Sequence, residues 1–276
     1  MKKIGYLGPK GTFSYEAVLK YIKDKPEYTG CDYNSIAELI LAVDRNELDE
    51  AIVPIENSLE GAINVTLDVL AFEVDLKIKD EVVIDICANL MVKKGTLPEN
   101  IRCILSHPQP LGQCRKFISS NYPNVDVKSV YSTAGAAETV AEGTGDLAAI
   151  GSSSVAGVYG LDIIASNIQD GYNNRTRFVV ISKNDGPNVG CNKTSIVFST
   201  EDKPGSLYRV LDIFNLWDVN MVRIESRPAK NQLGNYIFFI DIEGHYDDPE
   251  LKDALTMIKR KTSFYKLLGS YPRYQE

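Results

Sequence analysis

The sequence predicts an α/β protein of two lobes, followed by a smaller module that combines strands and helices. As far as Ile181, short apolar segments typical of strands alternate with amphipathic segments typical of helices. A linker rich in turn-forming residues, 184–190, interrupts this pattern. Beyond the linker the expected order is strand, helix, strand, strand, helix, strand, which is the order of the ferredoxin-like fold.

Composition narrows the class of protein. The 276 residues suffice for two domains, and a net charge of −7 argues against a broad nucleic-acid-binding surface. No apolar run approaches the ~20 residues of a membrane span, and the chain starts directly with a strand instead of a signal sequence. We therefore expect no nucleic-acid partner and no membrane partner.

Cysteine and histidine usage excludes further classes. Five cysteines lie scattered and never form a C-x-x-C pair, a pattern typical of reduced thiols in the cytoplasm. With only two histidines, a histidine-built metal site is not expected, and neither a metal nor a cofactor is predicted.

The first lobe begins with a strand, Lys2–Leu7, and a helix, Phe13–Ile22. The turn between them, 8–12, has two interpretations: an anion site at a helix N-terminus, or a tight turn with Thr12 or Ser14 as the helix cap. A second junction follows the strand Ala51–Pro54, where Glu56–Gly61 precedes a helix. Two polar junctions in register suggest one wall of a pocket.

The second lobe is expected to start where the long extended stretch Leu76–Val92 leaves the first. Strands are predicted at Ile101–Leu105, Val125–Tyr131, Leu147–Ile150 and Leu161–Ala165, and helices at Leu111–Ser119, 133–142 and Ser152–Tyr159. This alternation favours a mostly parallel sheet. The expected boundaries are 1–76 with 170–185 for the first lobe, 77–169 for the second, 186–193 for the linker and 194–276 for the module.

The elements expected in the module complete the chain. They are Thr194–Thr200, Ser206–Phe214, Met221–Ser226, a turn at Asn231–Gly234, Tyr236–Ile242, Pro249–Lys259 and Tyr265–Leu268.

A polar loop, 168–177, leads into the strand Phe178–Ile181 and offers an amide, a hydroxyl and two guanidinium groups within four positions. Alone it is more typical of a solvated loop than of a binding site. Polar side chains at the ends of other predicted strands change this balance, because open α/β sheets bind ligands there. The set is Thr12, Ser14, Glu56, Asn57, Ser58, Ser106, His107, Gln109, Gln113, Ser132, Thr133, Asn174, Thr176 and Arg177. It favours hydrogen bonding to a small polyanion over activation of a strong nucleophile.

A Cys/His nucleophile is the competing interpretation, since Cys114 follows His107 by seven residues. Cys114 shares an apolar helical stripe with Leu111 and Ile118, which favours an inert core thiol.

Four motifs in order along the chain resemble those of the prephenate dehydratases. They are Tyr6–Ser14, Pro54–Gly61, Ser106–Cys114 and Asn174–Phe178. The module is similar to the ACT regulatory domain of that family, through Gly205-Ser206-Leu207 and Glu225-Ser226-Arg227-Pro228. The resemblance implies a bilobal catalytic domain like that of periplasmic binding proteins, with substrate between the lobes.

The resemblance also implies the reaction, the decarboxylative dehydration of prephenate to phenylpyruvate in L-phenylalanine biosynthesis. It makes Thr176 the catalytic residue, as a hydrogen-bond donor to the departing hydroxyl because a threonine is too weak an acid to do more. Arg177 is then expected to clamp the side-chain carboxylate of the substrate. The remaining substrate-binding residues expected are Thr12, Ser14, Glu56, Asn57, Ser58, Ser106, His107, Gln113, Thr133, Asn174 and Phe178.

For the module, the resemblance implies that L-phenylalanine binds between paired ACT domains. Gly205, Ser206 and Leu207 would meet its carboxylate. The amine of the effector and the rest of the pocket would be surrounded by Asn220, Glu225 and Ser226. A homo-oligomer follows, expected as a tetramer built as a dimer of dimers. Gly205 can also be a plain helix start after Pro204, and serine at position 206 instead of the family's alanine leaves the sign and affinity of regulation open.

Two other functions remain open: an arogenate dehydratase, and a non-catalytic amino-acid-sensing bilobal binding protein. A secreted solute-binding protein fits the lobes but not the N-terminus. The start at the first strand favours a monofunctional enzyme without a fused chorismate mutase.

Overall fold

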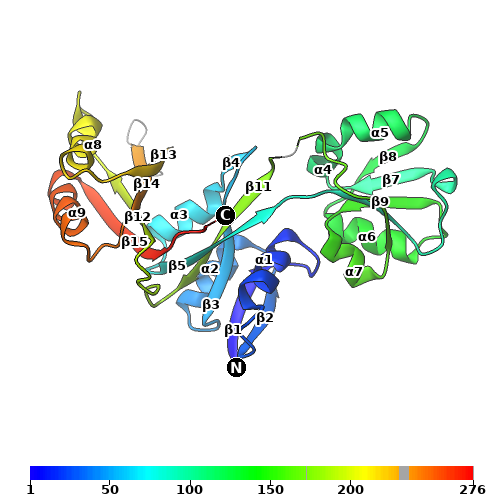
Figure 1. Ribbon diagram of the computed structural model, residues 1–276, viewed down its shortest axis with the longest axis horizontal. Coiled ribbons are helices and arrows are strands. Elements are labelled where there is room, and N and C mark those ends of the chain that lie inside the picture. Colours follow the sequence, from blue (N-terminus) through cyan, green and yellow to red (C-terminus); the bar gives the residue numbers. More distant parts are fainter. Residues whose placement is uncertain (172, 230–235, 276) are drawn as a thin grey trace.

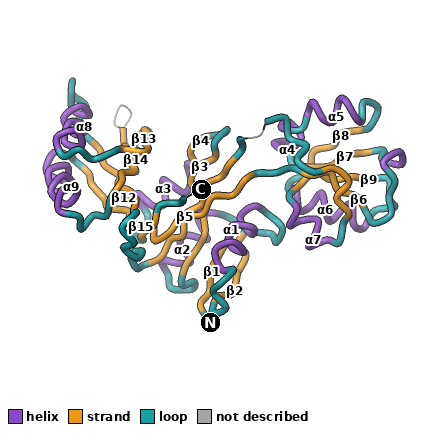
Figure 2. Tube along the Cα trace, viewed as in Figure 1, coloured by secondary structure: helices purple, strands orange, loops and turns teal. Residues whose placement is uncertain are grey.

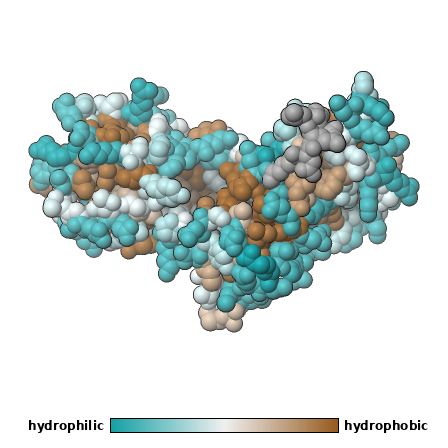
Figure 3. Space-filling view, turned by 180° about the vertical axis from the view of Figure 1, so that it is seen from behind, coloured by the Kyte–Doolittle hydropathy of each residue, from teal (hydrophilic) through white to brown (hydrophobic). Residues whose placement is uncertain are grey.

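The computed structural model describes residues 1–171, 173–229 and 236–275. Its three parts lie in a row, with the first lobe between the second lobe and the C-terminal module (Figure 1). A space-filling view from behind shows a patch of apolar residues at the middle of the molecule (Figure 3). Among the described residues, no helix is long and apolar enough to cross a membrane.

The first lobe is built on a mixed sheet of order β2-β1-β3-β11-β5, with β4 paired to β3. Strand β1 is parallel to β2 and β3, whereas β11 is antiparallel to β3 and β5. The elements are β1 (Lys2–Leu7), α1 (Phe13–Ile22), β2 (Tyr28–Tyr33), α2 (Ile36–Asp44), β3 (Glu50–Asn57), β4 (Gly61–Ala62), α3 (Asn64–Phe72), β5 (Lys77–Asp85) and β11 (Arg175–Ser182).

Alternation along the strands gives this sheet two apolar faces. Ile52, Phe178 and Val180 pack with α1, and Val53 and Val179 pack with α2 and α3. The expected boundary at residue 77 is wrong, because β5 pairs with β11 over its length. The crossing into the second lobe therefore follows Asp85.

The second lobe has a sheet of order β10-β6-β9-β7-β8. Of the four pairings recorded among its described strands, β7–β8 and β7–β9 are parallel and β6–β9 and β6–β10 antiparallel. The mostly parallel sheet that was predicted is therefore wrong here. The elements are β6 (Asn89–Val92), a 3₁₀ turn (Pro98–Asn100), β7 (Cys103–Ser106), α4 (Pro108–Gln113), α5 (Arg115–Asn121), β8 (Asp126–Ser129), α6 (Thr133–Glu142), β9 (Leu147–Gly151), α7 (Ser153–Tyr159) and β10 (Asp162–Ala165).

The module has the predicted ferredoxin-like order. Its elements are β12 (Asn192–Ser199), α8 (Ser206–Leu216), β13 (Met221–Pro228), β14 (Tyr236–Glu243), α9 (Pro249–Lys261) and β15 (Phe264–Pro272). They form an antiparallel sheet of order β13-β14-β12-β15. Helices α8 and α9 lie together on its outer side (Figure 2). The turn expected at Asn231–Gly234 lies outside the described residues.

The opposite face of the module's sheet packs on the first lobe. Phe239 and Tyr271 join Leu70 and Leu76 in one buried apolar cluster. A Cβ atom at Gly269 would lie 2.4 Å from the carbonyl oxygen of Ile78, so this approach requires glycine. The two domains therefore share a core.

Candidate active site

The site lies where the end of β3 meets the start of β11, with Asn57 opposite Thr176. The Asn57 Nδ2 group donates to Thr176 Oγ1 at 2.9 Å. Its Oδ1 atom accepts from the backbone N–H groups of Leu59 and Glu60 at 2.9 and 3.0 Å. These two donors fix the orientation of the amide, because only an oxygen can accept them. The Thr176 oxygen therefore receives a hydrogen bond, and its own proton is directed to another acceptor.

Asn174 connects this pair to the second lobe. Its Oδ1 accepts from Asn57 Nδ2 at 2.8 Å, and its Nδ2 donates to Gln113 Oε1 at 3.2 Å. Gln113 ends α4, so the contact crosses between the lobes. A cavity of about 170 Å³ adjoins it, lined by Leu59, Gln113, Gln169, Asp170, Gly171 and Asn174. The cavity is thus lined by neutral amides and by the Asp170 carboxylate, which accepts from the Lys116 N–H group. The Thr176 hydroxyl is not among the lining groups and is linked to them through Asn57 and Asn174.

Thr12 and His107 serve as helix caps. Thr12 accepts from the Tyr15 N–H and donates to the Leu7 carbonyl, and His107 Nδ1 accepts from the Gln109 N–H. These contacts favour the capping interpretation of the first turn.

Other predicted residues hold the strand ends. Ser58 Oγ donates to the Asn173 carbonyl at 2.7 Å, and the fully buried Ser106 donates to the Ile150 carbonyl at 2.6 Å. Ser14 is buried on α1, Thr133 begins α6, and Phe178 lies in the core beneath α1.

The turn before α1 meets α7 of the second lobe. Ser152 Oγ donates to the Gly11 carbonyl at 3.0 Å, and Ser154 Oγ donates to Glu16 Oε1 at 2.5 Å. Gly11 has φ +90°, and a Cβ atom there would lie 2.7 Å from a Val155 methyl. The sequence reasoning missed Glu16 and these serines, although the serines follow a predicted strand as the other candidates do.

Arg177 and Glu56 lie apart from the Thr176 hydroxyl. In the register of β3 and β11, Arg177 faces Glu56 and Phe178 faces Pro54, so Ile55 is the extra residue of a β-bulge. Arg177 Nη2 donates to Asp241 Oδ2 of the module at 2.8 Å. The expected clamp on a substrate carboxylate is therefore corrected: the guanidinium is committed to the domain interface.

The charges at that interface stabilise the ionised forms of Arg177 and Asp241. Burial would lower the pKa of Arg177, but Asp241, Tyr271 and Glu81 raise it above its usual value. Burial would likewise raise the pKa of Asp241, but Arg177 and Arg223 hold it below the usual range of a carboxyl. Cys114 is inert: burial raises the pKa of its thiol to about 12, as the core interpretation predicts.

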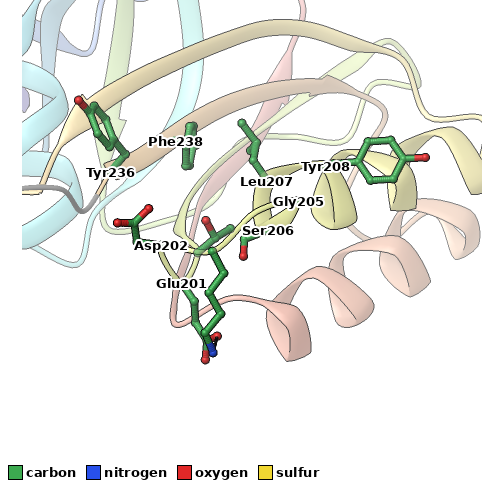
Figure 4. Close-up of a pocket in the computed structure, with 10 residues that line it drawn as sticks. Glu201, Asp202, Gly205, Ser206, Leu207, Tyr208, Tyr236 and Phe238 are labelled. Atoms are coloured by element: carbon green, nitrogen blue, oxygen red, sulfur yellow. Dashed lines mark ion pairs between the residues drawn. The ribbon is translucent and has the colours of Figure 1, made fainter.

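A second candidate site lies in the module. A pocket of about 360 Å³ opens at the N-terminus of α8, lined by Thr200, Glu201, Asp202, Lys203, Gly205, Ser206, Leu207, Tyr208, Tyr236 and Phe238 (Figure 4). Its volume lies in the range typical of small-molecule sites. The predicted Gly205, Ser206 and Leu207 therefore line one pocket.

The other three predicted effector residues are dispersed within one chain. Ser226 pairs with Phe238 of the pocket, whereas Glu225 pairs with Phe239, which faces the first lobe. Asn220 follows α8, so the length of this 11-residue helix, about 16 Å, separates it from Gly205.

Comparisons with known proteins cover both domains of the chain. The prephenate dehydratase family model matches residues 4–186 and the ACT domain model matches 194–256. A prephenate dehydratase of Methanocaldococcus jannaschii is 42% identical, with 98% of each chain covered. The structure of the prephenate dehydratase of Arthrobacter aurescens in complex with L-Phe has a TM-score of 0.89 and 35% identity, covering 98% of this chain and 90% of that one. A structure described as a quorum-quenching acylase has a TM-score of 0.86 and 30% identity, covering 99% and 98%.

Proposed function

The chain belongs to the prephenate dehydratase family, with a C-terminal ACT domain, and on that premise we propose that it converts prephenate to phenylpyruvate, CO₂ and water. The observation that carries this proposal is the hydrogen bond from Asn57 Nδ2 to Thr176 Oγ1. Because Thr176 Oγ1 accepts this hydrogen bond, its own O–H group can donate a hydrogen bond to the substrate.

The reaction needs little from the enzyme beyond positioning. The bond between the ring and its carboxylate breaks, CO₂ leaves, and the electron pair enters the ring. The C–O bond of the ring hydroxyl breaks, and the departing hydroxide takes a proton from solvent to become water. Thr176 donates a hydrogen bond to that oxygen as negative charge develops on it. Because Asn57 polarises the same hydroxyl, the donor strengthens without becoming an acid.

Neutral groups suit the carboxylate that is lost. A guanidinium bound to it would stabilise the ground state and oppose decarboxylation. Asn174 and Gln113 offer amide contacts instead, and the pairing of Arg177 with Asp241 keeps that cation at the domain interface.

The ACT domain carries the regulation. The pocket at Gly205–Leu207 is the L-phenylalanine site of this proposal, supported by the L-Phe complex of the Arthrobacter aurescens relative. Because Asn220 and Gly205 lie at opposite ends of α8, joint contact with one effector requires a second chain. This supports a homo-oligomer, for which we propose a tetramer built as a dimer of dimers. Five free thiols support a cytoplasmic location.

Steady-state assays test the proposal. The purified protein is expected to form phenylpyruvate from prephenate, and Thr176→Ala to lower kcat by about 10²–10⁴-fold with the fold intact. Thr176→Ser, which keeps the hydroxyl, should retain most of the activity. Preference for arogenate, hydrolysis of an acyl amide, or near-normal turnover by Thr176→Ala would each contradict the proposal.

A further inference from the structure

A cluster of buried and partly buried charges joins the candidate active site to the ACT domain. We call it the interdomain ion cluster, and it consists of Glu56, Glu81, Arg177, Lys193, Arg223 and Asp241. Three of these residues come from the catalytic domain and three from the ACT domain. The cluster lies on the face of the first sheet that packs against the ACT domain.

Asp241 is the buried anchor of this cluster. Its side chain is 5% exposed, and its Oδ2 atom accepts from Arg177 Nη2 at 2.8 Å. Its Oδ1 atom accepts from Ser195 Oγ at 2.5 Å, and Ser195 in turn lies 2.7 Å from the Tyr271 hydroxyl. A carboxylate held on both oxygens has a fixed position, so Asp241 gives Arg177 a rigid partner.

A second link runs through Glu56. Its Oε2 atom lies 3.2 Å from Arg223 Nε and 3.3 Å from Arg177 Nε. Both are ionic contacts without hydrogen-bond alignment, and Arg223 Nε and Nη2 have no hydrogen-bond partner. Glu56 is thus held by one cation from each domain.

The two anchored residues are the chain neighbours of the two residues that make the site. Arg177 follows Thr176 on β11, and Glu56 precedes Asn57 on β3. Neighbouring side chains on a strand point to opposite faces, so a displacement of one moves the backbone that carries the other. The Asn57–Thr176 hydrogen bond therefore depends on where the ACT domain holds Arg177 and Glu56.

The same ACT strand reaches the effector pocket. Tyr236 and Phe238 of β14 line that pocket, and Asp241 lies three residues beyond Phe238, about 10 Å along the strand. A single strand thus connects the pocket with the anchor of Arg177.

We propose that Asp241 and Arg223 are positioning residues for the dehydration: by pairing with Arg177 and Glu56, the ACT domain aligns Thr176 with Asn57. The inference rests on the proposed function of Thr176. It assigns the ACT domain a part in turnover without effector, in addition to regulation. A shift of a fraction of an ångström at Thr176 suffices for a measurable effect, because a misplacement of about 1 Å can cost about 10²-fold in rate.

The test compares Asp241→Asn with a matched control at another interdomain ion pair. Asp68 on α3 accepts from Arg227 Nε and Nη2, each at 3.0 Å, and is similarly shielded, but it has no strand neighbour in the site. Asp241→Asn is expected to lower kcat on prephenate about tenfold with KM within about twofold. Asp68→Asn should leave kcat within about twofold. Asp241→Glu, which restores the charge, should recover part of kcat.

A second readout does not depend on turnover. In protein labelled with ¹³C at threonine methyl groups, the Thr176 resonance, assigned from Thr176→Ser, should shift in Asp241→Asn and not in Asp68→Asn. Ser195→Ala, a milder change at the same anchor, should shift the resonance in the same direction. It keeps the inference testable even if Asp241→Asn does not fold. If wild-type protein does not turn over prephenate, the proposed function fails while the resonance still decides the inference. An unmoved Thr176 resonance, or equal losses of kcat in Asp241→Asn and Asp68→Asn, would overturn it.

Discussion

Replacing Asn57 with aspartate changes one atom and reverses the hydrogen bond on which the proposed mechanism depends. The Oδ1 position still accepts from Leu59 and Glu60, so the turn after β3 keeps its partners. The former Nδ2 position, 2.9 Å from Thr176 Oγ1, becomes an oxygen that cannot donate. The Thr176 hydroxyl then donates to this oxygen and can no longer donate a hydrogen bond to the substrate.

The expected magnitude separates catalysis from stability. Loss of one donor to a developing oxyanion lowers kcat by about 10²–10³-fold, or roughly 3–4 kcal/mol of barrier. Folding loses the donations to Thr176 and Asn174 but gains the reversed bond from Thr176, so the free energy of unfolding should fall by only about 1–2 kcal/mol. Asn57→Asp is therefore expected to fold and to turn over slowly.

The pH profile supplies the sharpest assay for this variant. A protonated carboxyl has an O–H donor, and burial raises the pKa of a carboxyl above its ordinary value of about 4. The ratio of kcat in Asn57→Asp to that of the wild type should therefore rise as the pH falls from about 8 to 5. Asn46→Asp, the same chemical change at an exposed residue of the first lobe, serves as the control. A kcat within about threefold of the wild type at pH 8, or a flat ratio, would refute the reasoning.

Three further predictions concern stability and reactivity. In the native protein Cys114, with its pKa raised to about 12 by burial, should resist iodoacetamide at pH 8 while the exposed Cys191 is alkylated, as mass spectrometry of tryptic peptides would show. Gly269→Ala should lower the free energy of unfolding by about 3 kcal/mol, because φ is +135° and the new Cβ atom meets the Ile78 carbonyl. Gly95→Ala is the control, because Gly95 also has a positive φ but open space around it. It should lower the free energy of unfolding by only about 1 kcal/mol, and a denaturant titration measures both variants. The pKa of Asp241 is lowered in the folded state, so its contribution to stability is present above a pH of about 4 and is lost as the pH falls through the folded pKa. Urea titrations should therefore show a smaller loss of stability between pH 5 and 3 in Asp241→Asn than in the wild type.

Periodicity and turn chemistry predicted most of the elements, and the structure brings Asn57, Asn174 and Thr176 of the family motifs together. The order of strands and helices in the ACT domain agrees with the prediction, because each of these elements has a clear apolar period. β5 was assigned to the second lobe because an extended segment carries no sign of which strand it will pair with. The break between α4 and α5 at Cys114 was missed for a similar reason, since the apolar stripe continues across it.

The role of Arg177 shows where sequence reasoning fails at the site itself. Thr176 and Arg177 are adjacent in the motif, but strand geometry sends them to opposite faces. The bulge at Ile55 then brings Glu56 to the face of Arg177 and Asn57 to that of Thr176, which no alternation pattern in the sequence predicts. The charges that Arg177 meets come from residues 64 or more positions away, so only the pairing of β11 with β3 and β5 and the packing of the ACT domain reveal them.

The most direct test of the account is a single-turnover experiment on Thr176→Val, which replaces the hydroxyl by a methyl group of similar size. With enzyme in excess over prephenate, the rate of the chemical step and the substrate dissociation constant are measured separately. The account predicts a chemical step slowed by about 10²–10⁴-fold and a dissociation constant within about threefold of the wild type, because the hydroxyl acts on the departing oxygen in the transition state. A chemical step at the wild-type rate, or a loss that appears entirely in the dissociation constant, would contradict it.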